Sequence, residues 1–212
     1  YGLYAPVNET YFRGLGVQTI LGGEFEEGLV QAVESRPAST AEETISLERL
    51  NFILPDRAGL PTLKQYAHVV LPDGNSRVAG YTEASRGCKH LCRHCPIVPV
   101  YKGVFRVVSK DVVLADIRQQ VAAGATHITF GDPDFLNGPA HAMAIVEALH
   151  QEFPSITYDV TIKIEHLLRH SNHLCALRDS GCLFVTTAAE SVDDAVLDRL
   201  DKGHARADFL AT

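Results

Sequence analysis

The eight residues CKHLCRHC, at positions 88–95, decide how the rest of this chain is interpreted. Cys88, Cys92 and Cys95 have the spacing C-x3-C-x2-C, shortly after a segment that predicts a strand. Three thiolates this close together can bind three corners of a cubane iron–sulfur cluster. The fourth iron then has no protein ligand nearby, so it is open to a small molecule. The spacing therefore predicts a cluster that activates a ligand rather than one that only carries electrons.

A structural zinc site is the simpler alternative. Zinc usually takes four ligands, and CxxC is a frequent half-site. Cys92 and Cys95 would supply that half, and Cys88 with His90 or His94 would complete it. No second CxxC or HxxxH pair lies at the distance along the chain from Cys92 and Cys95 that a zinc ribbon or zinc finger has. This favours the iron–sulfur cluster.

Composition and charge exclude some classes of function. The chain has 212 residues, 46% hydrophobic and 21% charged, which suits one large domain or a domain plus a fragment. The net charge is −7 and no basic run is long, so nucleic acid is not expected as a bulk partner. No apolar run approaches the length of a membrane span, so no membrane partner is expected either.

The cysteine count and the chain ends carry further expectations. Five cysteines, three of them clustered, predict a reducing compartment, the cytoplasm. Cys175 and Cys182 flank a predicted helix end, and we expect buried apolar thiols there. The chain starts at Tyr1, which looks like the middle of a strand, and stops inside a helix-like stretch. We therefore expect a piece of a longer protein.

Strands and helices alternate along the second half of the chain, after a hairpin whose turn is 72–75. Helices are expected at 110–123, with Ser109 as N-cap, and at 139–153, 166–180 and 191–202, the last capped by Ser191. Strands are expected at 78–80, 127–130, 156–165 and 182–189. This alternation predicts four parallel βα units. Near the N-terminus, 17–22 predicts a strand, the following residues a helix to Ser35, and 37–43 a polar linker.

From 81 to 204 the chain resembles the radical S-adenosylmethionine (SAM) superfamily, most specifically in its three cysteines. One branch of this superfamily has an N-terminal cobalamin-binding domain. This chain resembles that branch at Glu190-Ser191, Leu197, Leu200 and Lys202-Gly203. The resemblance implies an α/β fold with a partial (β/α)6 barrel over 78–212, with about four units present. It also implies a remnant of a Rossmann-like domain at 1–36, followed by a linker and hairpin at 37–77.

The resemblance also implies a chemistry. A reduced [4Fe–4S] cluster passes one electron to SAM, and the resulting 5′-deoxyadenosyl radical removes hydrogen from a substrate, here a small molecule or peptide of unknown identity. An electron donor such as flavodoxin or ferredoxin is implied. The cysteines are ligands and no catalytic side chain is assigned. The cobalamin-ligating D-x-H-x-x-G stretch is absent from this chain, which leaves cobalamin binding open. A non-catalytic binding or scaffold domain, with zinc or an inert cluster at the same cysteines, remains the alternative.

Candidate SAM contacts follow the strands, since sites in parallel βα folds form at the carboxyl ends of strands. Gly131-Asp132-Pro133 resembles a shortened form of the family's Gly-Gly-Glu-Pro stretch, which implies that Asp132 binds the amino group of the methionine part of SAM. The alternative is a simple Asp-Pro turn before a helix. Glu190 lies where the family presents a polar group to the ribose, although it also suits a helix N-terminus. His94 lies where the family places an aromatic residue against adenine.

The third strand predicts a polar barrel interior. Thr157, Asp159, Thr161, Lys163 and Glu165 share one face of it. Lys163 could meet the SAM carboxylate or a substrate, and Glu165 could hold a hydroxyl or an amine. A solvated strand face is the alternative. The spacing of His166, His170 and His173 also allows a transition-metal site, which nothing else in the sequence supports.

Overall fold

The computed structural model describes residues 1–34 and 44–212. Two compact units form, one from Tyr1–Asn51 with Gly87–Val104 and the other from Phe52–Arg86 with Phe105–Thr212. The predicted linker at 37–43 lies outside the described residues. The division of the chain at 36/37 and 77/78 stays a prediction. Among the described residues, no helix combines the length and the apolar character needed to cross a membrane.

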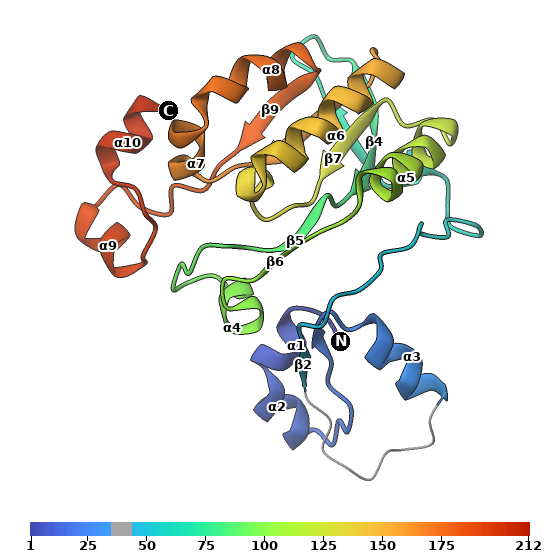
Figure 1. The fold of residues 1–212 in the computed structure, drawn as a ribbon, viewed down its shortest axis with the longest axis vertical. Coiled ribbons are helices and arrows are strands. Elements are labelled where there is room, and N and C mark those ends of the chain that lie inside the picture. The colour runs from blue at the N-terminus through green and yellow to red at the C-terminus, as the bar shows by residue number, and fades with distance from the viewer. Residues whose placement is uncertain (35–43) are drawn as a thin grey trace. The chain divides into compact units, whose positions relative to one another are not determined.

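A sheet forms the centre of the second unit (Figure 1), and it has five strands. Its order is β3-β4-β7-β8-β9, in which β3 and β4 are antiparallel and the other pairs are parallel. The strands are β3 (Ala67–Val70), β4 (Ser76–Thr82), β7 (His127–Phe130), β8 (Thr157–Thr161) and β9 (Cys182–Thr186). The antiparallel pair is the predicted hairpin, with Asp73 accepting hydrogen bonds from Asn75 in its turn. A separate two-stranded sheet pairs β5 (Ser85–Gly87) with β6 (Phe105–Val107).

Helical segments follow each parallel strand, which confirms the four predicted βα units. The longer ones are α5 (Lys110–Ala122) and α6 (Pro139–Glu152). The shorter ones are α7 (Ile164–Arg169), α8 (Leu174–Asp179), α9 (Asp194–Arg199) and α10 (Arg206–Ala211), with single turns η1 (Leu63–Gln65), η2 (Phe135–Asn137) and η3 (Ser171–His173). The hydroxyl of Ser109 accepts a hydrogen bond from the amide of Val112, so it is the predicted N-cap of α5.

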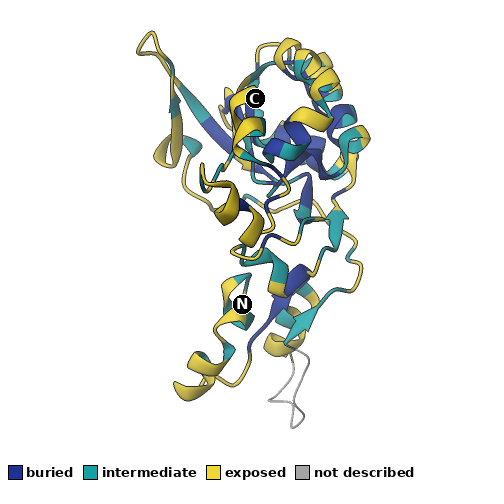
Figure 2. Ribbon diagram, turned by 90° about the vertical axis from the view of Figure 1, so that its left-hand side faces the viewer, coloured by how far each residue is buried: buried dark blue, intermediate teal, exposed yellow. Residues whose placement is uncertain are grey.

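The sheet has one apolar and one polar face. Figure 2 colours the ribbon by burial class, with the buried parts in dark blue. Ile128, Phe130, Tyr158 and Val160 are at most 1% exposed and pack with residues of α5, α6 and α8 in one hydrophobic core. Because side chains alternate along a strand, the residues between them point to the opposite face. That face carries His127, Thr129, Thr157 and Asp159. The predicted division of β8 into an apolar and a polar face is therefore confirmed.

Several expected boundaries in this unit are wrong. The strand expected at 156–165 ends at Thr161, and α7 begins at Ile164, so Glu165 lies on a helix and not on the strand. The helix expected at 166–180 is divided into α7, η3 and α8, and the strand expected at 182–189 ends at Thr186. Asp193, not Ser191, caps α9, because its carboxylate accepts hydrogen bonds from two amides of the first turn.

The first unit has short elements. They are α1 (Tyr4–Val7), α2 (Glu9–Gly14), β1 (Gly22–Gly23), α3 (Glu26–Glu34), β2 (Ile45–Ser46) and α4 (Ile97–Tyr101). β1 and β2 are parallel, with α3 between them in sequence. Gly23 has a φ of 70°, and a Cβ on it would overlap the carbonyl oxygen of Ser46, so only glycine fits. Of the strand expected at 17–22, only Gly22 lies in a strand, so this prediction is wrong for 17–21. The start of the chain forms a helix rather than the expected strand.

Candidate functional site

The cysteine loop lies in the first unit, between β5 and α4. Its start is fixed by Gly87, where a Cβ would overlap the carbonyl oxygen of Val104 and would lie 2.6 Å from the Tyr101 ring. Within the loop, the amide of Cys95 donates to the carbonyl of Cys92 over 3.1 Å, which forms a tight turn. The loop therefore holds its cysteines on a short, packed segment.

None of the five cysteines forms a disulfide. Cys92 is buried, whereas Cys88 and Cys95 are partly exposed. A zinc ion with Zn–S bonds of about 2.3 Å would bring its sulfurs to within about 4 Å of one another. In the described part of the chain, these cysteines belong to no set of three donor atoms lying within 4.8 Å of one another. The loop is thus not preformed for a mononuclear zinc ion, whereas a cubane holds its thiolates farther apart.

The other two cysteines differ from each other. Cys182 is partly buried against the core, and burial, with the charge of Asp159 as a second cause, raises the pKa of its thiol to about 12. The thiol predicted to be buried is therefore only partly buried. Cys175 is exposed, so the prediction of a buried thiol is wrong there.

Asp132 is buried at the end of β7, and its carboxylate has protein partners. One oxygen accepts a hydrogen bond from the amide of Ala84 over 2.9 Å, and the other accepts one from the hydroxyl of Ser85 over 2.5 Å. Burial raises the pKa of this carboxyl to about 6, which the two hydrogen bonds only partly offset. Asp132 therefore joins the end of β7 to the residues just before the cysteine loop, a role that the sequence did not reveal.

The neighbours of Asp132 are also tightly placed. A Cβ on Gly131 would overlap the ring of Tyr81, so the glycine makes room for that ring. Burial, followed by the charge of Glu83, raises the pKa of Tyr81 to about 12. Pro133 is partly exposed. Together these contacts restrict the loop that follows β7.

Lys163 and Glu165 lie together at the start of α7. The Lys163 ammonium is 3.1 Å from the Glu165 carboxylate, which also pairs with Arg169. A Cβ on Gly203 would lie 2.5 Å from a Glu165 oxygen and 3.2 Å from the Lys163 nitrogen. The turn at Gly203 therefore packs directly on this pair.

Glu190 approaches the same turn from the end of β9. Its carboxylate is 3.6 Å from the ammonium of Lys202, a side chain only 6% exposed. Its φ of 65° lies in the left-handed region, which is strained for a residue with a Cβ. The structure thus brings the predicted residues Lys163, Glu165 and Glu190 to one neighbourhood around 202–203.

Thr187, just after β9, has a buried hydroxyl without a hydrogen-bond partner among the described residues. His204 follows the turn at Gly203, and the backbone of Lys202 and of Ala189 lies within reach of its ring. Burial, followed by the charge of Lys202, lowers the pKa of His204. Buried polar atoms are normally satisfied, so orphaned ones at the carboxyl end of a strand are typical of a place that a polar ligand completes.

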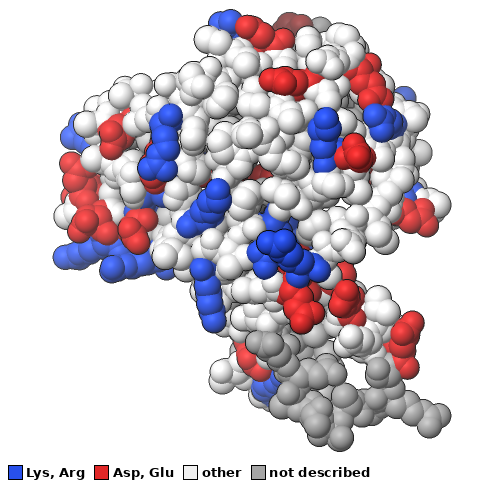
Figure 3. All heavy atoms as spheres, in the orientation of Figure 1, with Lys and Arg blue, Asp and Glu red and all other residues white. Residues whose placement is uncertain are grey.

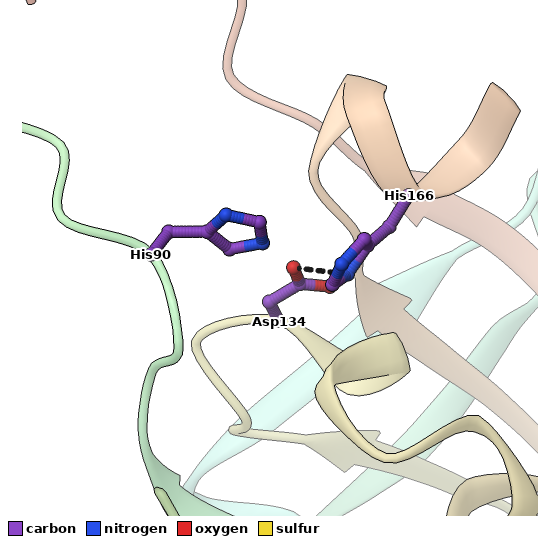
Figure 4. Close-up of side chains that lie close together, drawn as sticks. All are labelled: His90, Asp134 and His166. Atoms are coloured by element: carbon purple, nitrogen blue, oxygen red, sulfur yellow. Dashed lines mark ion pairs between the residues drawn. The ribbon is translucent and has the colours of Figure 1, made fainter. Parts of the chain in front are cut away.

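Asp134 and His166 form a buried pair that the sequence did not predict (Figure 4). Their carboxylate oxygen and ring nitrogen are 2.7 Å apart, and they come from the loop after β7 and from α7. His170 lies next to His166, with ring centroids 5.3 Å apart. Within the described residues, His166, His170 and His173 bring no three donor atoms together, so the metal site considered from their spacing is not supported.

His94 is exposed on the cysteine loop. The SAM-contact roles of His94, Gly131, Asp132 and Pro133 stay predictions.

Comparison with known proteins agrees with this architecture. A family model described as the radical SAM superfamily matches residues 82–212. The ribosomal protein uS12 methylthiotransferase RimO of Syntrophotalea carbinolica is 26% identical over 129 residues, 58% of this chain and 28% of that protein. The tRNA-2-methylthio-N(6)-dimethylallyladenosine synthase of Desulfosudis oleivorans is 26% identical over 162 residues, 70% of this chain and 33% of that protein. The chain thus spans about a third of the length of these relatives.

Solved structures show the same fold. The cobalamin-dependent SAM radical enzyme OxsB with aqua-cobalamin bound aligns with a TM-score of 0.56 at 15% identity, covering 98% of this chain and 33% of that one. OxsB with aqua-cobalamin and SAM bound aligns with a TM-score of 0.51 at 19% identity, covering 66% of this chain and 26% of that one. With a family model matching well over half of its residues and a curled sheet of four βα units, this chain belongs to the radical SAM superfamily and has a partial radical SAM barrel.

Proposed function

We propose that this chain is the cluster-binding part of a radical SAM enzyme, with Cys88, Cys92 and Cys95 as ligands of a [4Fe–4S] cluster. The observation that carries the proposal is three reduced cysteines on one packed loop, in a chain whose barrel belongs to the family. When bound, the cluster and SAM would supply one-electron reductive cleavage of the sulfonium C–S bond, to methionine and a 5′-deoxyadenosyl radical that takes hydrogen from the substrate. A reducing compartment such as the cytoplasm would keep the thiols available.

The donor set fits such a cluster. Three thiolates and no fourth cysteine nearby suit a cubane with one open iron. A structural zinc site would need a fourth ligand and closely spaced sulfurs, and the loop is not preformed for them. What the protein contributes is the placement of these thiolates on a segment packed at Gly87.

Lys163, Glu165 and Glu190 are proposed as the polar contacts of SAM. Both charge signs occur around the turn at 202–203, and SAM carries an ammonium, a carboxylate and ribose hydroxyls. The unpaired hydroxyl of Thr187 at the end of β9 supports a polar ligand there. Gly131, Asp132, Pro133 and His94 remain proposed contacts, although the Asp132 carboxylate already accepts two hydrogen bonds.

The range of possible partners and substrates is broader than the sequence suggested. The name of one relative includes tRNA and that of another a ribosomal protein, so the exclusion of nucleic acid is not confirmed. Acidic and basic side chains are interspersed over the face of the second unit seen in Figure 3. A small molecule, a peptide or a larger substrate are all compatible with the proposal, which also requires an electron donor such as flavodoxin or ferredoxin. Cobalamin remains a proposal, based on two solved structures described as binding it.

Anaerobic reconstitution with iron and sulfide tests the proposal. We expect a broad absorbance near about 400 nm that changes when SAM is added. We also expect 5′-deoxyadenosine to form under reductant. Alanine at Cys88, Cys92 or Cys95 should abolish the absorbance and the product, whereas Cys175→Ala, at an exposed cysteine outside the loop, should keep both. Stoichiometric zinc without SAM cleavage in the wild-type chain would instead identify a non-catalytic metal-binding domain.

A further inference from the structure

A hydrogen-bonded cluster lies on the polar face of the sheet, opposite the helices. The ring of His127 is completely buried, with one nitrogen 2.8 Å from the hydroxyl of Thr157 and the other 2.8 Å from a carboxylate oxygen of Asp159. The hydroxyl of Thr129 donates to the same Asp159 oxygen over 2.7 Å. These contacts fix the orientation of a carboxylate that is 8% exposed.

The second oxygen of Asp159 is free to accept. Both protein contacts go to Oδ1, and among the described residues Oδ2 accepts no hydrogen bond. The side chain keeps 11% of its surface exposed. Oδ2 is not among the fully buried polar atoms of the described residues that lack a partner, so this oxygen can be reached from solvent. The free oxygen is therefore suited to a donor from outside the protein.

An aromatic ring lies beside this carboxylate. Phe184 is the partner of Asp159 in the register of β8 and β9. Its ring is stacked on that of His127, with centroids 6.2 Å apart and an interplanar angle of 11°. Phe184 is nevertheless 44% exposed, so part of the ring is open to a ligand. A carboxylate next to an accessible aromatic face is a combination that attracts organic cations.

The cluster also borders an open space. A cavity of about 1010 Å³ reaches Thr129, which is the member of the cluster that lines it. Its other walls include Leu60, Leu63, Tyr81 and residues at the end of α5. Its size matches that of cavities that bind small ligands, and its walls are largely apolar. An apolar body could occupy this space while a charged group reaches the cluster.

We propose that Asp159 and Phe184, with His127 and Thr129 as orienting residues, bind the positively charged group of an organic cation, a protonated amine with an apolar body. This ligand is the substrate or part of it, an assignment that rests on the proposed function. The carboxylate accepts the ammonium through Oδ2, and the ring of Phe184 contacts the cation. No covalent step is involved.

Phenethylammonium chloride is the probe, and 2-phenylethanol is its neutral match. Binding to the reconstituted full chain is followed by the nitrogen-15 resonances of the His127 ring and by calorimetry. We expect the ammonium to bind at least tenfold more tightly than the alcohol, which corresponds to about 1.4 kcal/mol. Asp159→Asn should remove this preference, and Phe184→Leu should weaken ammonium binding severalfold.

Asp111→Asn is the control, since it removes the same charge at an exposed position on α5. It should leave binding unchanged. Equal binding of ammonium and alcohol, equal binding to wild type and Asp159→Asn, or the same loss in both Asp variants would overturn the proposal. If Asp159→Asn fails to fold, the proposal is still tested by ammonium binding to Phe184→Leu and by the comparison of ammonium and alcohol binding to wild type. Cluster absorbance and SAM cleavage are measured separately, so a wild-type chain that binds the cation but does not cleave SAM would refute the enzymatic proposal and leave the cation site.

Discussion

Replacing Asp132 by asparagine should change how the stability of the second unit depends on pH. Burial raises the pKa of this carboxyl from 3.8 to about 6. The folded chain therefore binds a proton more tightly than the unfolded chain between these two values. It follows that this group makes the free energy of unfolding fall as pH rises from about 4 to about 6. The amide of asparagine cannot ionise, so the Asp132→Asn variant lacks this contribution.

The magnitude follows from the shift and the hydrogen bonds. A shift of about two pKa units corresponds to about 3 kcal/mol of lost stability between pH 4 and pH 7. Near pH 4 the wild-type carboxyl is protonated, and the asparagine amide resembles it in offering one carbonyl acceptor and one donor group to the partners at Ala84 and Ser85. We expect the two proteins to be similarly stable near pH 4, and the variant to be more stable than wild type by up to about 3 kcal/mol above pH 7.

Urea unfolding of both proteins at several pH values between 4 and 8 measures this effect. The difference between their unfolding free energies cancels the ionisations that they share. Asp111→Asn, at an exposed position, should show a pH profile parallel to that of wild type. If the Asp132→Asn profile is parallel to wild type as well, the carboxyl does not titrate near pH 6, and the reasoning from its burial is refuted.

Two other substitutions test the packing around the site. Arg57→Ala removes the bidentate partner, 2.7 and 2.8 Å away, of the Asp116 carboxylate, which is 4% exposed, and should lower the free energy of unfolding in urea by about 2 kcal/mol. Arg118→Ala removes one partner of the surface pair Arg118–Glu152 and should lower it by less than about 1 kcal/mol. Equal losses in the two variants would contradict a role for burial. Gly203→Ala places a Cβ 2.5 Å from Glu165 at a φ of 70°, so its thermal midpoint should fall by an amount equivalent to about 1–2 kcal/mol; an unchanged midpoint would show that the turn relaxes freely.

Local patterns were sufficient where local chemistry sets the structure. Ser109 could be recognised as an N-cap because its hydroxyl satisfies an amide of the next turn, three residues away. The two faces of β8 could be read from alternation because only one face packs on helices. The boundary at Thr161 was missed, since Ile162 and Ile164 continue the apolar alternation beyond the point where the backbone turns into α7.

Contacts between distant segments were not predictable in the same way. Asp132 was interpreted from its neighbours in sequence, but the partners of its carboxylate are Ala84 and Ser85, nearly fifty residues earlier. The pairing of Asp134 with His166 was missed for the same reason. No periodicity or spacing encodes which buried acceptor meets which donor across two strands.

By itself, the sequence determined the cysteine spacing, the alternation of strands and helices and hence the family of this chain, because these depend on residues close together along the chain. Only the tertiary structure decided that the Asp132 carboxylate is held by backbone and hydroxyl donors, and that His127, Asp159 and Phe184 meet on one face. The physical reason is that strand order and register are set by the packing of the whole sheet. They bring His127 and Asp159 of two neighbouring strands within hydrogen-bond distance and place the ring of Phe184, on a third strand, beside them.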